Sequence, residues 1–131
     1  MTKGTAPDIH LDTSFLIRAL VASSAESETL RKWLRARHAV AICTLAWGEF
    51  LCGPLDDRVG GLARRVVRTH IPLGIDEATE AARLFNATGR RRGSFQDCIV
   101  AATAVTSGAS LATTDRADFE RFVPQGLQLA E

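Results

Sequence analysis

The sequence has few of the features that mark secreted, membrane or fibrous proteins. Its longest apolar stretch, residues 98–105, falls far short of the ~18 residues needed to cross a bilayer, so no membrane location is expected. Its 4 prolines and 10 glycines exclude a collagen-like or low-complexity chain. Lys+Arg 16 against Asp+Glu 15 gives a net charge of +1, so any polyanion must be bound through local charge separation.

Cysteine is also scarce. Cys43, Cys52 and Cys98 are odd in number and lie in apolar neighbourhoods, which indicates reduced thiols in a core. They lack Cys-x-x-Cys spacing, so structural zinc is not expected. Residues 1–4 lead towards Asp8 without the apolar centre of a signal peptide. We therefore expect a cytoplasmic protein.

The composition is that of a globular domain, with 46% hydrophobic and 24% charged residues and no internal repeat or linker. A chain of 131 residues buries its own core, so we expect one domain over residues 1–131. Short apolar runs alternate with helical patterns, which predicts an α/β fold with a parallel sheet. Strands are expected at residues 9–12, 39–43, 70–75 (at a sheet edge), 110–113 and 127–129. Helices are expected at residues 13–21, 44–51 and 94–107, and at 55–69 with a break around Gly60 and Gly61. Two more helices are expected, one beginning at a capping box of Ser23 and Glu26 and one beginning at a cap of Asp76.

Four acidic residues fall at special places in this pattern. Asp12 lies at the C-terminal end of the first strand and Asp115 at the C-terminal end of a later one. Glu49 lies one turn into the helix after the second strand, and Asp97 lies in the first turn of the most apolar helix. The carboxyl ends of parallel strands form the ligand crevice of an open sheet. The four carboxylates are therefore expected to converge on one edge.

Such a cluster needs a positive charge. Two carboxylates ~5 Å apart at an effective dielectric constant of ~20 repel each other by roughly 3 kcal/mol, equivalent to about two pKa units. Oxygen ligands favour hard ions, so Mg²⁺ or Mn²⁺ is the expected occupant. Water bound to such an ion loses a proton more readily and becomes a nucleophile for a phosphoryl group.

Each acid also has a simpler interpretation. Asp97 completes a capping box with Ser94, Asp12 and Asp115 are typical of turns at strand ends, and Glu49 is compatible with a solvated helix face. Asp118 either assists the metal through water or caps a short turn before Phe119. The common edge predicted for the first four favours the metal site.

These residues resemble the PIN-domain ribonucleases, and in particular the VapC-type toxins of bacterial toxin–antitoxin pairs. The resemblance rests on Leu-Asp-Thr-Ser at residues 11–14, Glu49, Asp-Cys-Ile-Val-Ala-Ala at 97–102, and Ala-Thr-Thr-Asp at 112–115 with Phe119 downstream. It covers essentially the whole chain. The fold it implies is a three-layer sandwich in which helices flank a parallel sheet of about five strands.

The resemblance also implies a function. Asp12, Glu49, Asp97 and Asp115 would bind Mg²⁺ or Mn²⁺ and catalyse RNA hydrolysis, with Ser14 and Thr113 as supporting polar residues. A VapB-like antitoxin and a second copy of the chain would be the partners. An exposed patch among the helix residues Phe15, Trp33, Trp47, Phe50 and Leu51, otherwise expected in the core, would mark the partner groove.

Arginines supply most of the positive charge. Arg90, Arg91 and Arg92 precede the helix of Asp97 and depart from the shorter, less basic approach usual in the family; Arg116 follows Asp115 directly. All four suit RNA phosphates through bidentate hydrogen bonds. Another group, Arg64, Arg65 and Arg68, is expected on the solvent side of a helix.

Other functions remain open at this point. A signalling receiver domain would need a lysine at a late strand end, but Lys3 and Lys32 are the only lysines. A nucleophile pair of Ser14 and His10 lacks the nucleophile-elbow motif. A non-catalytic PIN-like module would tolerate the loss of an acid, and none is missing. Cleavage of DNA, or RNA processing unrelated to toxicity, is compatible with the same pocket.

Overall fold

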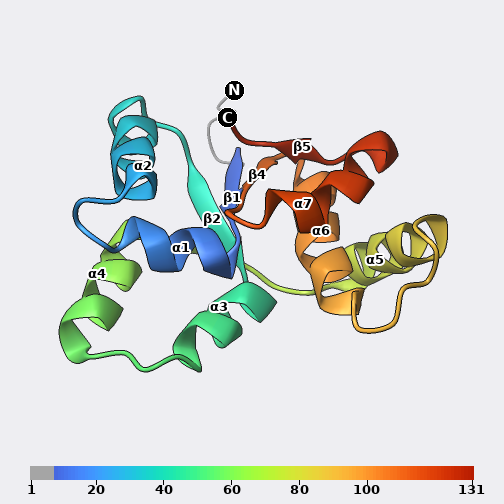
Figure 1. Cartoon of the computed structure of the whole chain (residues 1–131), viewed down its shortest axis with the longest axis horizontal. Helices are drawn as coiled ribbons and strands as arrows, with labels where there is room; N and C mark the ends of the chain where they lie inside the picture. The colour runs from blue at the N-terminus through green and yellow to red at the C-terminus, as the bar shows by residue number, and fades with distance from the viewer. Residues whose placement is uncertain (1–7) are drawn as a thin grey trace.

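The computed structural model describes residues 8–131; residues 1–4, on which the expectation of no leader rests, lie outside this range. Five parallel strands form one sheet in the order β3-β2-β1-β4-β5 (Figure 1). The strands are β1 (Ile9–Leu11), β2 (Val40–Cys43), β3 (Thr69–Ile71), β4 (Ser110–Ala112) and β5 (Gln128–Leu129). The predicted five-stranded parallel sheet is confirmed, and the third strand lies at a sheet edge as expected.

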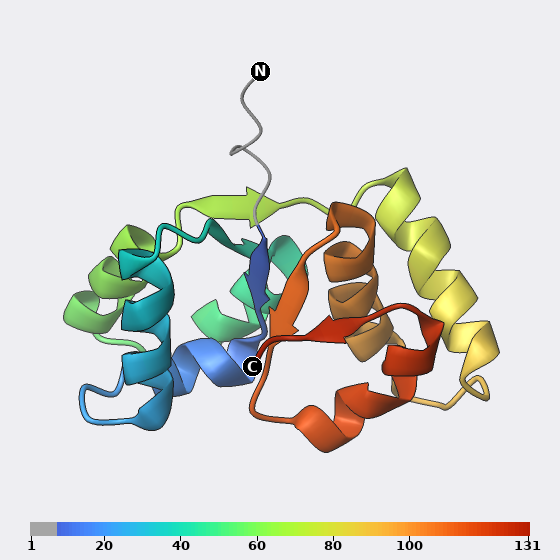
Figure 2. The same ribbon diagram turned by 90° about the horizontal axis from the view of Figure 1, so that it is seen from above.

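Helices flank this sheet. They are α1 (Thr13–Ala19), α2 (Ala25–Arg35), α3 (Thr44–Leu51), α4 (Asp57–Val66), α5 (Ile75–Ala87), α6 (Phe95–Ser107) and α7 (Arg116–Phe119), followed by the 3₁₀ helix η1 (Glu120–Gln125). Figures 1 and 2 show α5 and α6 side by side at one end of the molecule and α1, α2 and α4 at the other. No helix within residues 8–131 is long and apolar enough to span a membrane.

The core joins the sheet to buried side chains of α1, α2, α3, α4, α5 and α6, and α6 contributes more of them than any other helix. Strands β1 and β2 are buried along their whole length, and α6 buries every residue from Cys98 to Ala104. Phe119 and Phe122 close the core from the C-terminal side. Helix α6 ends at Gly108, whose φ of 69° is the left-handed conformation that suits glycine. A buried α6 fixes the position of Asp97 in its first turn.

Several predicted helix starts are displaced. Ser24, not Ser23, caps α2, and its hydroxyl accepts a 3.0 Å hydrogen bond from Ser27 N. Asp76 does not cap α5; the cap is Gly74, whose N–H donates to Glu77 Oε1 at 3.0 Å. In both cases the cap is a residue one or two positions away from the predicted one.

The other corrections concern the middle of the chain. Helix α4 is continuous through Gly60 and Gly61, because its buried face uses the small residues Gly60 and Ala63. It ends at Val66, so Thr69 belongs to β3 rather than to the helix. The expected capping box of Ser94 and Asp97 is absent, since Ser94 Oγ donates to the Arg91 carbonyl at 2.7 Å. Cys43 and Cys98 are buried as predicted, but Cys52 is exposed because α3 ends there.

Candidate active site

Asp12 lies directly after β1 and is only 7% exposed. Its Oδ2 accepts two hydrogen bonds of 2.9 Å, from Ser14 Oγ and from Thr113 Oγ1. Burial raises the pKa of Asp12, and these hydroxyl donors oppose the rise because they stabilise the carboxylate. A buried carboxylate held in one orientation by two hydroxyls is suited to act as a ligand.

The two hydroxyls also connect the ends of β1 and β4. Ser14 Oγ and Thr113 Oγ1 are 3.2 Å apart, and each accepts a hydrogen bond from a backbone N–H of the loop after β4. Thr114 N donates to Ser14 Oγ at 3.2 Å, and Asp115 N donates to Thr113 Oγ1 at 2.9 Å. Through this network Asp115, an exposed residue, is held near Asp12, and its charge contributes to raising the pKa of Asp12.

Glu49 reaches the same region from α3. Its Oε1 accepts a 3.1 Å hydrogen bond from Thr13 Oγ1, which also contacts the Ala46 carbonyl at 2.9 Å. Thr13 therefore fixes an otherwise exposed carboxylate by joining the first turn of α1 to α3. The sequence reasoning did not select Thr13, although its position next to Asp12 was a usable signal.

Asp97 faces these acids from the start of α6. Burial is the largest cause of its raised pKa, and the charges of Asp12, Asp118 and Glu49 raise it further, while Arg121 lowers it. Asp97 thus lies within electrostatic reach of two other predicted acids although it comes from a different element. We call the carboxyl edge of the sheet with Asp12, Glu49, Asp97 and Asp115 the acid edge.

The acid edge is open rather than closed. Within residues 8–131, no three His, Cys, Asp or Glu side chains are close enough together to form a metal-binding group by themselves. The donor set nevertheless suits a hard divalent ion, because it consists of carboxylate and hydroxyl oxygens. Mg²⁺ keeps several of its waters in proteins and is bound through one or two carboxylates, so a wide arrangement of acids is compatible with it.

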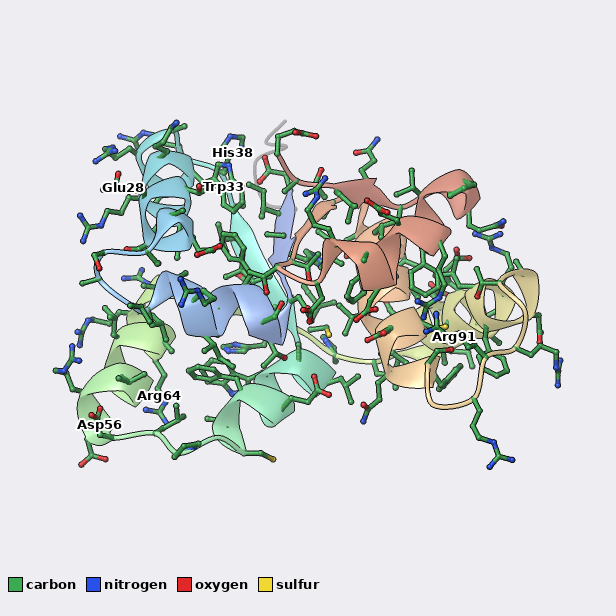
Figure 3. All side chains as sticks on the ribbon, viewed as in Figure 1. Glu28, Trp33, His38, Asp56, Arg64 and Arg91 are labelled. Atoms are coloured by element: carbon green, nitrogen blue, oxygen red, sulfur yellow. The ribbon has the colours of Figure 1, made fainter. Side chains whose placement is uncertain are left out.

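A small hollow of 140 Å³ adjoins Asp97. Its lining consists of Arg91, Arg92, Gly93, Ser94, Asp97, Asp118 and Arg121. Figure 3 shows Arg91 near α6, at the opposite end of the molecule from Arg64 on α4. Two members of the predicted arginine loop are therefore placed beside an acid, together with Arg121, which the sequence reasoning missed.

The remaining predicted arginines lie differently. Arg90, with φ 53°, donates to Asn86 Oδ1 and lies over the Phe85 ring, so it is engaged with α5. Arg116 donates to the Ala130 carbonyl at 3.0 Å and lines a hollow shared with Thr113. The predicted solvent group, Arg64, Arg65 and Arg68, is exposed as expected, but Arg68 lies beyond the end of α4 rather than on a helix.

Two minor predictions are settled by contacts. Asp115, not Asp118, is the N-cap of α7, so the capping role suggested for Asp118 is wrong.

His10 is 2% exposed, and neither ring nitrogen has a hydrogen-bond partner among the described residues. Burial lowers the pKa of His10 to about 4, so its ring is neutral at physiological pH. Ser14 pairs with Asp12 and Thr113 instead of His10, which does not favour a nucleophilic serine.

Comparison with known proteins identifies the family. The PIN domain profile matches residues 9–123. VapC ribonuclease Mb1587 of Mycobacterium bovis and ribonuclease VapC11 of Mycobacterium tuberculosis are each 33% identical to this chain over 121 residues, covering 86% of it and 89% of the relative.

Solved structures show the same fold. One is VapBC2 from Rickettsia felis bound to a promoter DNA fragment, with a TM-score of 0.74, 16% identity, and coverage of 93% of this chain and 96% of that one. Another is DNA-bound VapBC from Salmonella typhimurium, with a TM-score of 0.73, 16% identity, and coverage of 95% and 97%. The sequence matches show that the chain belongs to the PIN domain family and, within it, to the VapC ribonucleases.

Proposed function

We propose that this protein is an endoribonuclease dependent on Mg²⁺ or Mn²⁺ and the toxin of a VapBC-type toxin–antitoxin pair. The observation that carries the proposal is the hydrogen-bonded arrangement at the acid edge, where Thr113 Oγ1 donates to Asp12 Oδ2 and accepts the Asp115 N–H, so that two acids from the ends of β1 and β4 are held by one hydroxyl. The Asp12 side chain makes no capping hydrogen bond to α1, so a helix cap does not explain its burial. The names of the similar ribonucleases support the same activity.

In this proposal each residue has a defined role. Asp12, Glu49, Asp97 and Asp115 would hold the ion, and a bound ion would supply an activated water and stabilise charge on the phosphoryl oxygens. Ser14 and Thr113 keep the Asp12 carboxylate in one orientation, and Thr13 does the same for Glu49. Asp118 borders the hollow next to Asp97 and acts on the site through water. No side chain serves as a covalent nucleophile.

The substrate is held by arginines. Arg91 and Arg92 line the hollow next to Asp97, so they are placed to bind the RNA phosphates beside the cleaved bond. Arg116 lies on the other side, near Thr113, and Arg90 extends the basic surface along α5. Phosphate contacts of this kind position the strand without reading its sequence.

The partners are an antitoxin and a second copy of the chain. Phe15 and Phe50 are buried and Trp33 and Trp47 are half-buried, but Leu51, Ile17 and Val21 are 45%, 52% and 47% exposed. These exposed apolar side chains on α1, just after α1 and on α3 suit a segment of a VapB-like antitoxin. VapBC complexes among the similar structures support such a pairing. We propose further that the pairing takes place in the cytoplasm and that residues 1–131 form one domain.

The direct test compares cleavage of total RNA and of single-stranded DNA by the purified chain in Mg²⁺, in Mn²⁺ and in excess chelator. We expect RNA cleavage that needs the ion and is lost in Asp97→Asn. Brief induction in cells, followed by mapping of cut sites, identifies the RNA target, and co-expression of the antitoxin should abolish the cuts. Preference for DNA, or cleavage without growth arrest, would favour a DNA nuclease or a non-toxic RNA-processing enzyme instead.

A further inference from the structure

The acid edge contains a positive charge supplied by the chain itself. Arg121 on η1 places its Nη2 3.8 Å from Asp97 Oδ2. Two contacts fix the guanidinium in this position: Nη1 donates a hydrogen bond to the Asp118 carbonyl, and Cζ lies 4.4 Å from the centre of the Phe122 ring. Phe122 is fully buried, so the ring provides a rigid support for the charged group.

The rest of the guanidinium is poorly satisfied. Nε and Nη2 are shielded from solvent and have no hydrogen-bond partner within residues 8–131. The Arg121 side chain is 18% exposed, against 40% for Asp97. A cationic donor buried without hydrogen bonds is unfavourable unless an opposite charge compensates it. Asp97 is the anion positioned to do so.

The contact is electrostatic rather than orienting. At 3.8 Å the two groups form an ion pair, but no hydrogen bond joins them. Asp12, Asp118 and Glu49 all make the charged form of Asp97 less favourable, and Arg121 acts in the opposite direction. Arg121 therefore does for Asp97 what a bound cation would do, which is to offset the repulsion of its acidic neighbours.

We propose that Arg121 is a built-in counter-cation of Asp97 and that a divalent ion at the acid edge must compete with it for this carboxylate. The inference rests on the metal site of the proposed function. Without the ion, Arg121 offsets the repulsion between Asp97 and its acidic neighbours. With the ion bound, the positive charge of Arg121 lowers the affinity of the site for the ion.

Calorimetric titration with Mn²⁺ and thermal unfolding with and without Mn²⁺ test this competition. In Arg121→Gln we expect Mn²⁺ to bind about ten-fold more tightly, because a unit charge no longer repels the divalent ion. The Tm without metal should fall, and the rise in Tm on adding Mn²⁺ should be larger than in the wild type. Arg121→Lys keeps the charge, so its Mn²⁺ affinity should stay within about three-fold of the wild type.

Arg83→Gln is the matched control. Arg83 donates to the Gln125 side chain and carbonyl, so its loss also loosens η1 and removes one positive charge, but it leaves the pair of Arg121 and Asp97 intact. We expect its Tm to fall while its Mn²⁺ affinity stays that of the wild type. If Arg121→Gln does not fold, Arg121→Met replaces it, because the methionine stem still packs on Phe122.

The outcomes separate the inference from the proposed function. Unchanged or weaker Mn²⁺ binding in Arg121→Gln overturns the inference, and weaker binding would mean that Arg121 orients Asp97. If RNA cleavage that needs the ion persists in the wild type in that case, the proposed function stands. Absence of Mn²⁺ binding in the wild type and every variant overturns both the inference and the metal site.

Discussion

Thr113 Oγ1 donates a hydrogen bond of 2.9 Å to Asp12 Oδ2 and so joins two residues that are 101 positions apart in the chain. The same carboxylate oxygen accepts the Ser14 hydroxyl, and the same Thr113 oxygen accepts the Asp115 N–H. One threonine thus holds the acid after β1 and the loop that carries the acid after β4. Loss of this hydroxyl affects both sides of the proposed metal site.

Thr113→Val is therefore expected to lower kcat for RNA cleavage by about 10- to 100-fold, the usual effect of removing a group that supports a metal ligand. Valine has nearly the shape of threonine but offers neither the donor to Asp12 nor the acceptor for Asp115. Thr113→Ser retains both and should keep most of the activity. Steady-state cleavage of a fluorescent RNA measures the difference, and equal rates for valine and serine would contradict the supporting role.

Asp12→Asn and Asp97→Asn should each abolish cleavage while the fold is retained. Burial raises the pKa of the Asp12 carboxyl, so a neutral amide at this position is at least as well tolerated as the charge. We expect circular dichroism spectra like that of the wild type for both variants and a Tm at neutral pH that is no lower for Asp12→Asn. The Tm of Asp97→Asn should fall, because Arg121 loses its counter-ion. Wild-type activity in either variant, or in excess chelator, would refute the metal-binding assignment.

His10 predicts how stability depends on pH. In the unfolded chain its imidazole takes up a proton below its ordinary pKa of 6.5, but in the folded protein it stays neutral down to about 4. The unfolded state therefore binds more protons between these values, and stability falls as the pH is lowered through this window. The loss amounts to roughly 3 kcal/mol once the pH reaches about 4. The raised pKa values of Asp12 and Asp97 act in the opposite direction, since their protonation favours the folded state.

His10→Leu isolates this effect because leucine fills a similar volume without ring nitrogens. At pH 7 the free energy of unfolding should rise by about 1–3 kcal/mol, since two unpartnered polar atoms leave the core. The advantage over the wild type should grow towards pH 4.5. Urea unfolding at several pH values measures both quantities, and a constant difference across the range would show that His10 is not the group responsible.

If Arg91 and Arg92 bind RNA phosphates, RNA binding should weaken as the salt concentration rises. Changing both to glutamine should raise KM and reduce the slope of log affinity against log salt by about 0.7 for each lost contact with a single-stranded phosphate. Arg64 and Arg65 provide a matched pair, because they are also exposed neighbours but lie on α4 at the other end of the molecule (Figure 3). The same change there should leave the slope unaltered. Equal slopes in the two double variants would exclude a specific role for the arginine loop.

Much of the architecture follows from local sequence patterns. The order of strands and helices was predictable because each buried strand is a short apolar run and each is followed by a helical pattern. The break expected at Gly60 and Gly61 was wrong because a helix tolerates glycine where close packing needs a small residue. Cys52 was misplaced because apolar neighbours in the sequence do not show where a helix ends.

The candidate site was predictable only in part. Asp12 and Asp115 could be placed at one edge because parallel strands end on the same side of the sheet. Arg121 could not, since its contact with Asp97 depends on how η1 folds back over α6. The bond from Thr13 to Glu49 likewise arises from the crossing of α1 and α3, which no local pattern encodes.

The central position of β1 has a consequence for synthesis. Its pairing partner β4 begins at Ser110, so about a hundred further residues must be synthesised after Ile9 before β1 and β4 can pair. Domains generally fold as units once their segments have left the ribosome. A nascent chain would accordingly lack Asp97 and Asp115 at the acid edge until most of the chain has been translated, so the complete edge would assemble only after β4 has left the ribosome.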